Sequence, residues 1–302
     1  MEKFVYLVQS AGALPAIYDS IPCQRADLIR LTWEEPVDGA TFLPKSSWSQ
    51  RRNRLLNEVA ERGGEYLYYV FVDGDLTFDR GGWRQFEEGL LKYRPAIATP
   101  YCPEYRPANH RRQDLDAHTC YSFDAMFNAF HFDVARDTIV LPYYGGFDHE
   151  SWWYSQVCVI ELAELLYPRH VLQLNSTAVR QGEPDANQRI GDLARMERWF
   201  RTQVLRPTVS ARLARQALRV SRHVQSRLVD RRVAEDRRPV HPPSPPPATY
   251  RVPESLRRQL FNPDSVFWLR PSDPSARHFQ ARVTGRASEQ INHGGTETRR
   301  GA

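Results

Sequence analysis

The chain has 302 residues, of which 41% are hydrophobic and 12% aromatic. This composition is too rich in apolar residues for a disordered chain, and the apolar residues are too dispersed for a membrane-spanning protein. The net charge of +5 is unevenly distributed, because residues 1–200 carry 21 Lys and Arg against 28 Asp and Glu, whereas residues 201–302 carry 20 against 8. Since 38 of the 41 basic residues are Arg, we attribute part of the basic character to coding bias and expect no nucleic-acid partner.

The sequence also bears on the expected compartment. No stretch approaches the roughly 20 apolar residues that cross a bilayer, and the first residues turn polar too early for a signal sequence. The four cysteines lack a Cys-x-x-Cys spacing, which predicts reduced thiols rather than a zinc site or a disulfide framework. We therefore expect a cytoplasmic protein.

The first hundred residues alternate between two kinds of pattern. Apolar runs at 4–8 and 28–31 predict short strands, and Ser47 with Gln50 forms a capping-box pattern that opens a helix ending at Gly63. The run 66–72 is almost continuous in large and β-branched residues, as in a strand covered on both faces. This alternation predicts an α/β fold.

The remaining elements complete this prediction. In chain order we expect a helix at 83–93, a strand at 95–101, two short strands within 119–134, and further a strand at 138–142, a helix at 150–166 and a strand at 171–174. We predict a catalytic domain at 1–200, a basic helical extension at 201–238, and a Pro-rich linker with a mostly disordered tail at 239–302. The Arg-rich stripe of the extension offers a peripheral membrane contact as an alternative to packing on the domain.

The most informative pair of residues is Asp73 and Asp75, which follow the buried strand with one Gly between them. In an open α/β sheet, ligands bind at the carboxyl ends of the strands. Two carboxylates placed there suit Mg²⁺ or Mn²⁺ with phosphate oxygens and water completing the shell. The alternative is an ordinary turn at a strand end, because Asp and Gly are turn residues.

The surrounding order of motifs resembles the GT-A glycosyltransferases, particularly those of family 2. An Arg-Asn helix containing Arg52 and Asn53, a Gly-Glu-Tyr turn at 64–66, a hydrophobic strand and then Asp-x-Asp follow one another, as they do in that family. The resemblance is close over about 30 residues and loose over 1–175. It implies a mixed sheet flanked by helices, with the C-terminal segment outside it.

The resemblance also implies roles for single residues. Asp75 would bind the metal on the diphosphate of a nucleotide sugar, and Asp73 would contact the ribose or share the metal. Arg52 would lie near the nucleotide, where a guanidinium complements phosphate charge, with Asn53 beside it. Glu34, at the end of the second strand, is a weaker candidate for the base or ribose. For Arg52 and Asn53 the alternative is a solvated helix face.

A second group of residues lies at 143–156, where a Gly-Gly loop leads into a helix. Inverting transfer requires a carboxylate that removes the proton of the acceptor hydroxyl. Glu150 and Asp148 are the candidates for this base by resemblance, with Glu150 favoured. The family commonly has Glu-Asp here, whereas this chain has Asp-His-Glu, and Asp148 or Glu150 could instead cap the helix.

Other polar residues are weaker candidates. His170 precedes a predicted strand, roughly where some GT-A enzymes have a third metal ligand, although a single His is more often structural. Asp124 and Asn128 could face the sugar. The Gln-x-x-Arg-Trp motif of processive polysaccharide synthases is absent from the sequence, which favours a single addition.

We therefore expect a metal-dependent, inverting, non-processive glycosyltransferase that moves a sugar from a nucleotide-sugar donor to a hydroxyl of a glycan, lipid or protein. One alternative is a haloacid-dehalogenase-like phosphatase with Asp73 as nucleophile and Asp75 as acid and base. That alternative needs a later pair of acids and a basic residue, and Lys92 is the only Lys after Asp75. Another alternative is a degenerate GT-A-like module that binds sugar without turnover.

Overall fold

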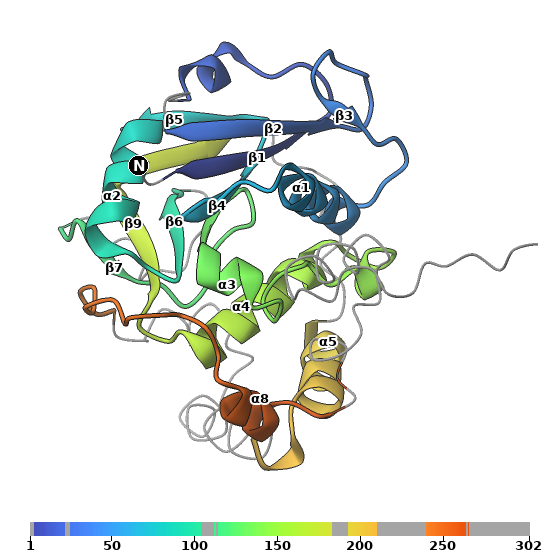
Figure 1. Ribbon diagram of the computed structural model, residues 1–302, viewed down its shortest axis with the longest axis vertical. Coiled ribbons are helices and arrows are strands. Elements are labelled where there is room, and N and C mark those ends of the chain that lie inside the picture. Colours follow the sequence, from blue (N-terminus) through green and yellow to red (C-terminus); the bar gives the residue numbers. More distant parts are fainter. Residues whose placement is uncertain are drawn as a thin grey trace, which may run out of the picture.

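The computed structural model describes residues 3–21, 25–103, 112, 114–182, 193–209, 240–263 and 265 (Figure 1). Its helices and strands, in chain order, are β1 (Phe4–Ser10), η1 (Ala16–Ser20), β2 (Ala26–Thr32), β3 (Thr41–Phe42), α1 (Trp48–Arg62), β4 (Tyr68–Asp73), β5 (Leu76–Arg80), α2 (Trp83–Tyr93), β6 (Ile97–Tyr101), β7 (Ala117–Thr119), β8 (Phe127–His131), α3 (Phe132–Arg136), η3 (Gly145–Phe147), α4 (Trp153–Leu166), β9 (Val171–Gln181), α5 (Leu193–Trp199), η4 (Phe200–Val204) and α8 (Glu254–Leu260).

The strands of the described residues form one mixed sheet in the order β3-β2-β1-β4-β8-β6-β9-β5, with β7 paired to β9. Strands β2, β1 and β4 run parallel, and β8 is antiparallel to both of its neighbours, β4 and β6. Strand β6 is in turn parallel to β9. The carboxyl ends of β1, β2, β4 and β6 therefore share one edge of the sheet with the amino end of β8. The predicted fold class, a mixed α/β sheet flanked by helices, is confirmed.

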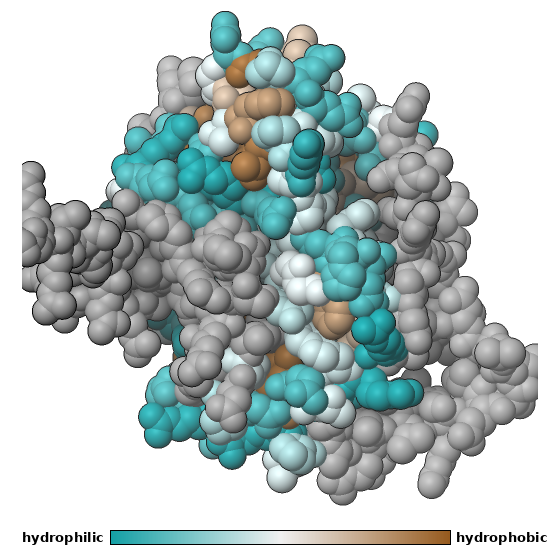
Figure 2. Space-filling model, turned by 90° about the vertical axis from the view of Figure 1, so that its right-hand side faces the viewer, coloured by the Kyte–Doolittle hydropathy of each residue, from teal (hydrophilic) through white to brown (hydrophobic). Residues whose placement is uncertain are grey.

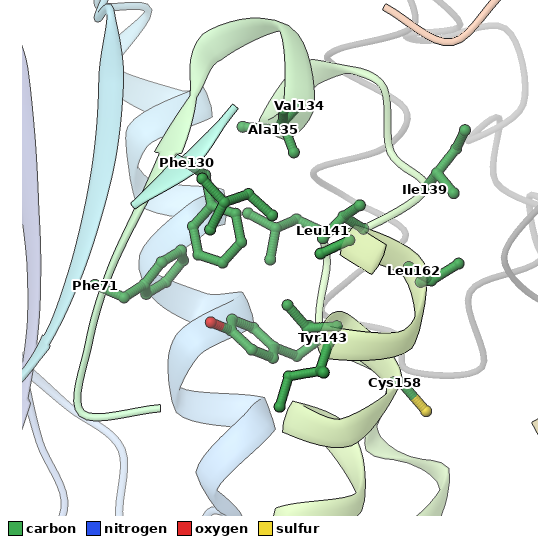
Figure 3. Close-up of a cluster of buried hydrophobic side chains, with 14 of the residues drawn as sticks. Phe71, Phe130, Val134, Ala135, Ile139, Leu141, Tyr143, Cys158 and Leu162 are labelled. Atoms are coloured by element: carbon green, nitrogen blue, oxygen red, sulfur yellow. The ribbon is translucent and has the colours of Figure 1, made fainter. Parts of the chain in front are cut away.

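Side chains along the central strands point alternately to the two faces of the sheet, and each face has its own hydrophobic core. In β4, Tyr69 and Phe71 face the core that holds α1 and α4, whereas Tyr68, Val70 and Val72 face the core that holds α2. The central strands are covered on both faces, and this is why their sequences are almost continuously apolar. Figure 3 shows the first core, where Phe71 and Phe130 point toward Tyr143 and Leu141, and the ring centroids of Phe71 and Tyr143 are 5.4 Å apart.

Helix α1 begins and ends where its sequence predicts. The Ser47 side chain accepts a hydrogen bond from the backbone of Gln50, and the Gln50 side chain accepts one from the backbone of Ser47, which completes the capping box. Gly63 takes a left-handed conformation with φ 68°, and its N–H closes the last turn on Val59. Because both ends of α1 are fixed, the positions of its residues around the helix axis are fixed as well, and they determine which polar side chains reach solvent.

Some predicted elements differ from the structure. Residues 138–142 form a buried turn rather than a strand, because Ile139, Val140 and Leu141 fill the space against α4 without pairing to the sheet. The region 119–134 contains strand β8 and the start of α3, while the other short strand, β7, ends at Thr119. The sequence reading also missed β5, which pairs with the far half of β9.

Residues 240–263 pack on the domain as an extended segment that ends in helix α8. Tyr250, Val252, Leu260 and Phe261 are buried in the core that holds α1 and α4. Phe261 also forms a bridge with Leu205. Part of the predicted linker is thus a built component of the domain. The boundaries at 200 and 238 stay a prediction, and residues 210–239 and 266–302 lie outside the described residues.

No helix of the described residues is long and apolar enough to cross a membrane. The face in Figure 2 shows hydrophilic residues with smaller hydrophobic spots between them. Large exposed hydrophobic side chains among the described residues are Phe42 and Leu256. The Arg-rich stripe on which the membrane contact was predicted, at 213–228, falls outside the described part of the chain.

Candidate functional site

Loops from three parallel strands meet at the carboxyl edge of the sheet, where the sequence predicted the site. The carbonyl of Ala11, after β1, accepts hydrogen bonds of 3.0 Å from the backbone N–H groups of Glu34 and Glu35, after β2. The N–H of Gly74, after β4, donates to the carbonyl of Gln9 at 2.8 Å. These bonds hold exposed Glu34 on the same edge as the Asp-Gly-Asp turn.

The Gly between the two acids is required by close packing. A Cβ atom on Gly74 would lie 2.4 Å from the Cβ of Ser10 and 3.0 Å from the carbonyl oxygen of Gln9. Real Cβ atoms essentially never approach so closely, so a side chain here would push the turn away from β1. The glycine therefore fixes where Asp73 and Asp75 emerge from the sheet.

Asp73 is held from several sides and is partly buried. Its Oδ1 accepts hydrogen bonds from Arg52 Nη2 at 2.7 Å and from Gln9 Nε2 at 2.8 Å. The hydroxyl of Tyr18 donates to the backbone carbonyl of Asp73, and burial together with the charges of Asp73 and Asp75 raises the pKa of that hydroxyl. Asp73 is thus a fixed carboxylate, with its Oδ1 on the protein side.

Asp75 stands more openly at the same edge. Its residue is exposed, and its backbone carbonyl accepts a 2.8 Å hydrogen bond from the N–H of Gly182. Partial burial and the neighbouring charge of Asp73 raise the pKa of the Asp75 carboxyl, while a hydrogen bond with the Gln181 side chain acts against them. A cation bound beside Asp75 would relieve the repulsion that the charge of Asp73 exerts on the ionised Asp75 carboxylate.

Arg52 and Asn53 do not lie where the resemblance placed them. Both are fully buried, with 0% exposure. Arg52 also donates to the carbonyl of Ala125 at 2.8 Å, and its guanidinium carbon lies 4.3 Å from the Trp48 ring centroid. Asn53 exchanges two hydrogen bonds with the backbone of Tyr143, of 2.9 and 2.8 Å. The nucleotide-binding predictions are corrected accordingly, because these side chains point inward and hold the site from behind.

Asp124 adds a third acid near the turn. Its Oδ1 accepts a hydrogen bond from the N–H of Met126 at 2.8 Å, and the carbonyl of Met126 accepts one from the N–H of Asp73 at 2.8 Å. Burial, with the charge of Asp73 as a smaller cause, raises the pKa of Asp124 to about 6, although Arg52 acts in the opposite direction. Asn128, in contrast, is fully buried and donates to Ala125.

The two candidate bases have different partners. Asp148 accepts hydrogen bonds from the hydroxyls of Ser47, the N-cap of α1, and of Ser49 in α1, and from Ser155 in α4 at 3.0 Å. It therefore ties the start of α1 to the start of α4. Glu150 instead pairs with Arg195 at 3.0 Å, and its Oε1 lies 3.5 Å from Nε2 of His149. Both carboxylates are engaged, and that of Glu150 is held by more exposed partners.

His170 lies at the opposite edge of the sheet. It precedes β9, and its carbonyl accepts hydrogen bonds from Ala96 and Ile97 at the start of β6. Since β6 and β4 run in the same direction, this is the amino edge, roughly 17 Å along the strands from Asp73 by the rise per residue. The ring of His170 packs on Tyr250 there. The structure thus corrects its place in the predicted metal-ligand set.

Asp73 and Asp75 are the predicted metal ligands that remain at the carboxyl edge. The described residues contain no group of three or more His, Cys, Asp and Glu side chains that could hold one. Asp75 and the second carboxylate oxygen of Asp73 still form a pair of hard oxygen donors, and Mg²⁺ commonly takes one or two carboxylates with phosphate and water. The residues fit a metal that a phosphate ligand helps to hold.

Sequence reasoning missed Gln9 and Tyr18 as supports of the turn. Gln9 is the last residue but one of β1, and its buried Oε1 has no hydrogen-bond partner among the described residues. Tyr18 lies in the short helix η1, between β1 and β2. A signal for Gln9 was present, because parallel pairing of two buried strands sets the last residues of β1 beside those of β4. Tyr18 had no comparable signal.

The chain matches no family model, and no curated protein matches it. Among solved structures, it is similar to GalNAc-T7 with UDP, GalNAc and Mn²⁺, at 8% identity and a TM-score of 0.43 over 66% of this chain and 48% of that one. It is also similar to S. aureus TarS 1–349, at 10% identity and a TM-score of 0.42 over 59% of this chain and 60% of that one. A197 from STIV is similar at 12% identity and a TM-score of 0.39, over 59% of this chain and 84% of that one. The chain thus spans about half of GalNAc-T7 and under two thirds of TarS. These are distant likenesses, so activity has to be inferred from this chain's own residues.

Proposed function

We propose that this protein is a metal-dependent glycosyltransferase of the GT-A type that adds one sugar from a nucleotide-sugar donor to an acceptor hydroxyl. The observation that carries the proposal is the Asp-Gly-Asp turn at the carboxyl end of β4. It is fixed by the close contact at Gly74 and exposes Asp75 beside Asp73. Ligands of open α/β sheets bind at this edge.

The chemistry assigned to the two aspartates is charge neutralisation. A Mn²⁺ or Mg²⁺ ion, when bound, would stabilise the negative charge of the departing diphosphate. Asp75 would hold that metal, and Asp73, fixed by Arg52 and Gln9, would share it or accept a ribose hydroxyl. Glu34 faces the same edge and is the candidate for a contact with the base or ribose.

The proton of the acceptor hydroxyl needs a carboxylate in an inverting transfer. Of the two candidates we favour Glu150, because Asp148 accepts three serine hydroxyls that fasten α1 to α4. Glu150 would have to part from Arg195, an exposed partner. Exposed ion pairs contribute about 0–1 kcal/mol, so an incoming acceptor could displace this one at small cost. The acceptor itself would be a glycan, a lipid or a protein.

The test is a comparison of the wild type with Asp75→Asn and a matched control, Asp116→Asn. Asp116 is an exposed acid paired with Lys92 at 3.1 Å. Calorimetric titration with MnCl2 and a panel of nucleoside diphosphates and sugar nucleotides measures binding, and nucleoside diphosphate release measures turnover. We expect Asp75→Asn to lose metal-dependent affinity at least tenfold without a lower unfolding temperature, and Asp116→Asn to bind as the wild type does.

Other results would point elsewhere. Full metal-dependent affinity in Asp75→Asn would contradict the assignment of the turn. Hydrolysis of p-nitrophenyl phosphate without nucleotide binding would favour the phosphatase alternative. Binding of a sugar nucleotide without turnover, across a broad set of acceptors, would favour a module that has lost catalysis.

A further inference from the structure

Two adjacent arginines in the first turns of α1 have opposite environments. Arg52 is fully buried, and three of its hydrogen bonds go to Asp73, Ala125 and Tyr143. Arg51, one position earlier on the helix, is only partly buried and lies on the side that faces β2. A guanidinium that is fully buried cannot reach a ligand outside the domain, whereas that of its partly exposed neighbour can.

Arg51 is a partly buried positive charge that forms no ion pair within the described part of the chain. Its guanidinium carbon lies 3.8 Å from the ring centroid of Trp33, and its Nε donates to the carbonyl of Ser47 at 3.2 Å. No carboxylate of the described residues forms an ion pair with it. Stacking on an indole stabilises a guanidinium by about 0.5–2 kcal/mol and leaves its edge available for hydrogen bonds.

The electrostatics agree with this geometry. Burial, with the charge of Arg52 as a smaller cause, lowers the pKa of Arg51 to about 10, while the charges of Asp73, Asp148 and Glu34 act in the opposite direction. These acids come from three separate segments that converge on the carboxyl edge. A desolvated cation without a close counter-charge is costly in a folded protein unless a ligand supplies the charge, and such groups gather at functional sites.

We infer that Arg51 binds a phosphate oxygen of the anionic ligand at the carboxyl edge, and that Arg52 serves only to position Asp73. The inference rests on the proposed function for the identity of that ligand, a nucleoside diphosphate or its sugar ester. Arg51 would approach the phosphate from the α1 side while the Asp-Gly-Asp turn approaches from β4. The planar fork of a guanidinium suits two phosphate oxygens at once.

The experiment uses the full chain and inorganic pyrophosphate with MnCl2 as the probe, measured by calorimetric titration. The variants are Arg51→Gln and Arg51→Lys. Arg54→Gln is the matched control, because Arg54 lies on the same helix, is partly exposed, and pairs with Glu58 and Glu61 of that helix. We expect Arg51→Gln to weaken pyrophosphate binding about tenfold or more, Arg51→Lys to fall between it and the wild type, and Arg54→Gln to have no effect.

A thermal unfolding scan separates binding from folding. Arg51→Gln removes an unpaired desolvated charge, so it should unfold near the wild-type temperature, whereas Arg52→Gln should unfold well below it. Wild-type affinity in Arg51→Gln, or a wild type that does not bind pyrophosphate, would overturn the inference. Arg51-dependent binding of pyrophosphate without any turnover of sugar nucleotides would instead leave it standing and reject the proposed transferase activity.

Discussion

The two edges of the sheet carry similar residues in opposite circumstances. At the amino edge, Asp133 accepts hydrogen bonds from the Thr249 hydroxyl at 2.7 Å and from the Tyr250 N–H at 3.0 Å. Asp137 accepts one from the N–H of Val252 at 2.7 Å and pairs with Arg257. Every one of these donors comes from the segment 240–263. The acids of this edge are thus sealed by the chain itself.

At the carboxyl edge, the acids are only partly satisfied. Asp73 is held on one oxygen by Arg52 and Gln9. Partial burial and the charge of Asp73 raise the pKa of the neighbouring Asp75 carboxyl. Arg51 forms no ion pair with a carboxylate of the described residues. The difference indicates at which edge a charged ligand would bind favourably. Charges that the protein already neutralises contribute to stability, whereas charges that it leaves exposed or unpaired are available for binding and catalysis.

The largest expected effect comes from the ion pair of buried Arg52 with partly buried Asp73 at the carboxyl edge. Arg52→Gln should lower the free energy of unfolding by about 3–5 kcal/mol, because it leaves Asp73 and the carbonyl of Ala125 without their strongest donor. Chemical denaturation measures this change. The surface variant Arg84→Gln, which removes an exposed ion pair with Glu88 on α2, should change the same quantity by less than about 0.5 kcal/mol. Similar values for both variants would show that Arg52 is not a structural anchor.

The role of Arg52 shows what the sequence could have revealed. The apolar positions of α1 include Trp48, Leu55, Leu56 and Val59, and Arg52 lies four residues after Trp48 on the same face. The helical period therefore predicts that Arg52 points inward. The family motif suggested a ligand-binding role from the residue type alone, whereas the position of Arg52 on the apolar face of the helix predicts that it is buried. The two aspartates needed no such correction, because a buried strand followed by Asp-Gly-Asp places them at its end.

Other features required the three-dimensional arrangement. His170 was expected near the metal from its place along the chain, but the antiparallel insertion of β8 and the direction of β9 put it at the opposite edge. The packing of the segment 240–263 on the domain could not be predicted from the sequence either, because Tyr250 and Val252 are isolated apolar residues after a Pro-rich run. Contacts between residues more than a hundred positions apart leave no local pattern to read.

The next expected effect is a contrast in pH dependence between the edges. Burial lowers the pKa of His131, at the amino edge, to about 4, with Arg94 also lowering it and Asp133 opposing. Its proton is bound less readily in the folded state, so stability is full above pH 6.5 and falls as the pH drops toward 4. Asp124, at the carboxyl edge, has a pKa raised to about 6. Below about pH 4, the ordinary pKa of Asp, this carboxyl is protonated in both the folded and the unfolded state and does not change the stability. As the pH rises from about 4 toward 6, the unfolded state loses the proton more readily, and the free energy of unfolding falls.

Two variants separate these opposing slopes. His131→Asn should flatten the loss of stability between pH 6.5 and 4, and Asp124→Asn, which keeps the acceptor for the Met126 N–H, should gain stability relative to the wild type as the pH rises from 4 to 6. One differing proton gives a slope of at most about 1.4 kcal/mol per pH unit. Urea unfolding at a series of pH values measures both. Parallel curves for a variant and the wild type would show that the residue does not titrate across folding.

The smallest expected effect tests whether the amino edge has any part in ligand binding. The hydroxyl of Tyr250 donates to the carbonyl of Arg94 at 2.6 Å, and its ring packs on His131 and Tyr167. Tyr250→Phe keeps the ring contacts and removes the hydrogen bond to Arg94 together with the longer contact, of 3.4 Å, between the hydroxyl and His170 Nδ1. The free energy of unfolding should therefore fall by about 1 kcal/mol. Affinity for pyrophosphate with Mn²⁺ should stay at the wild-type value, because the bond lies at the far end of the strands from Asp75. A loss of affinity in a variant that remains folded at the assay temperature would mean that the two edges are coupled, and the separation of a sealed edge from a binding edge would have to be abandoned.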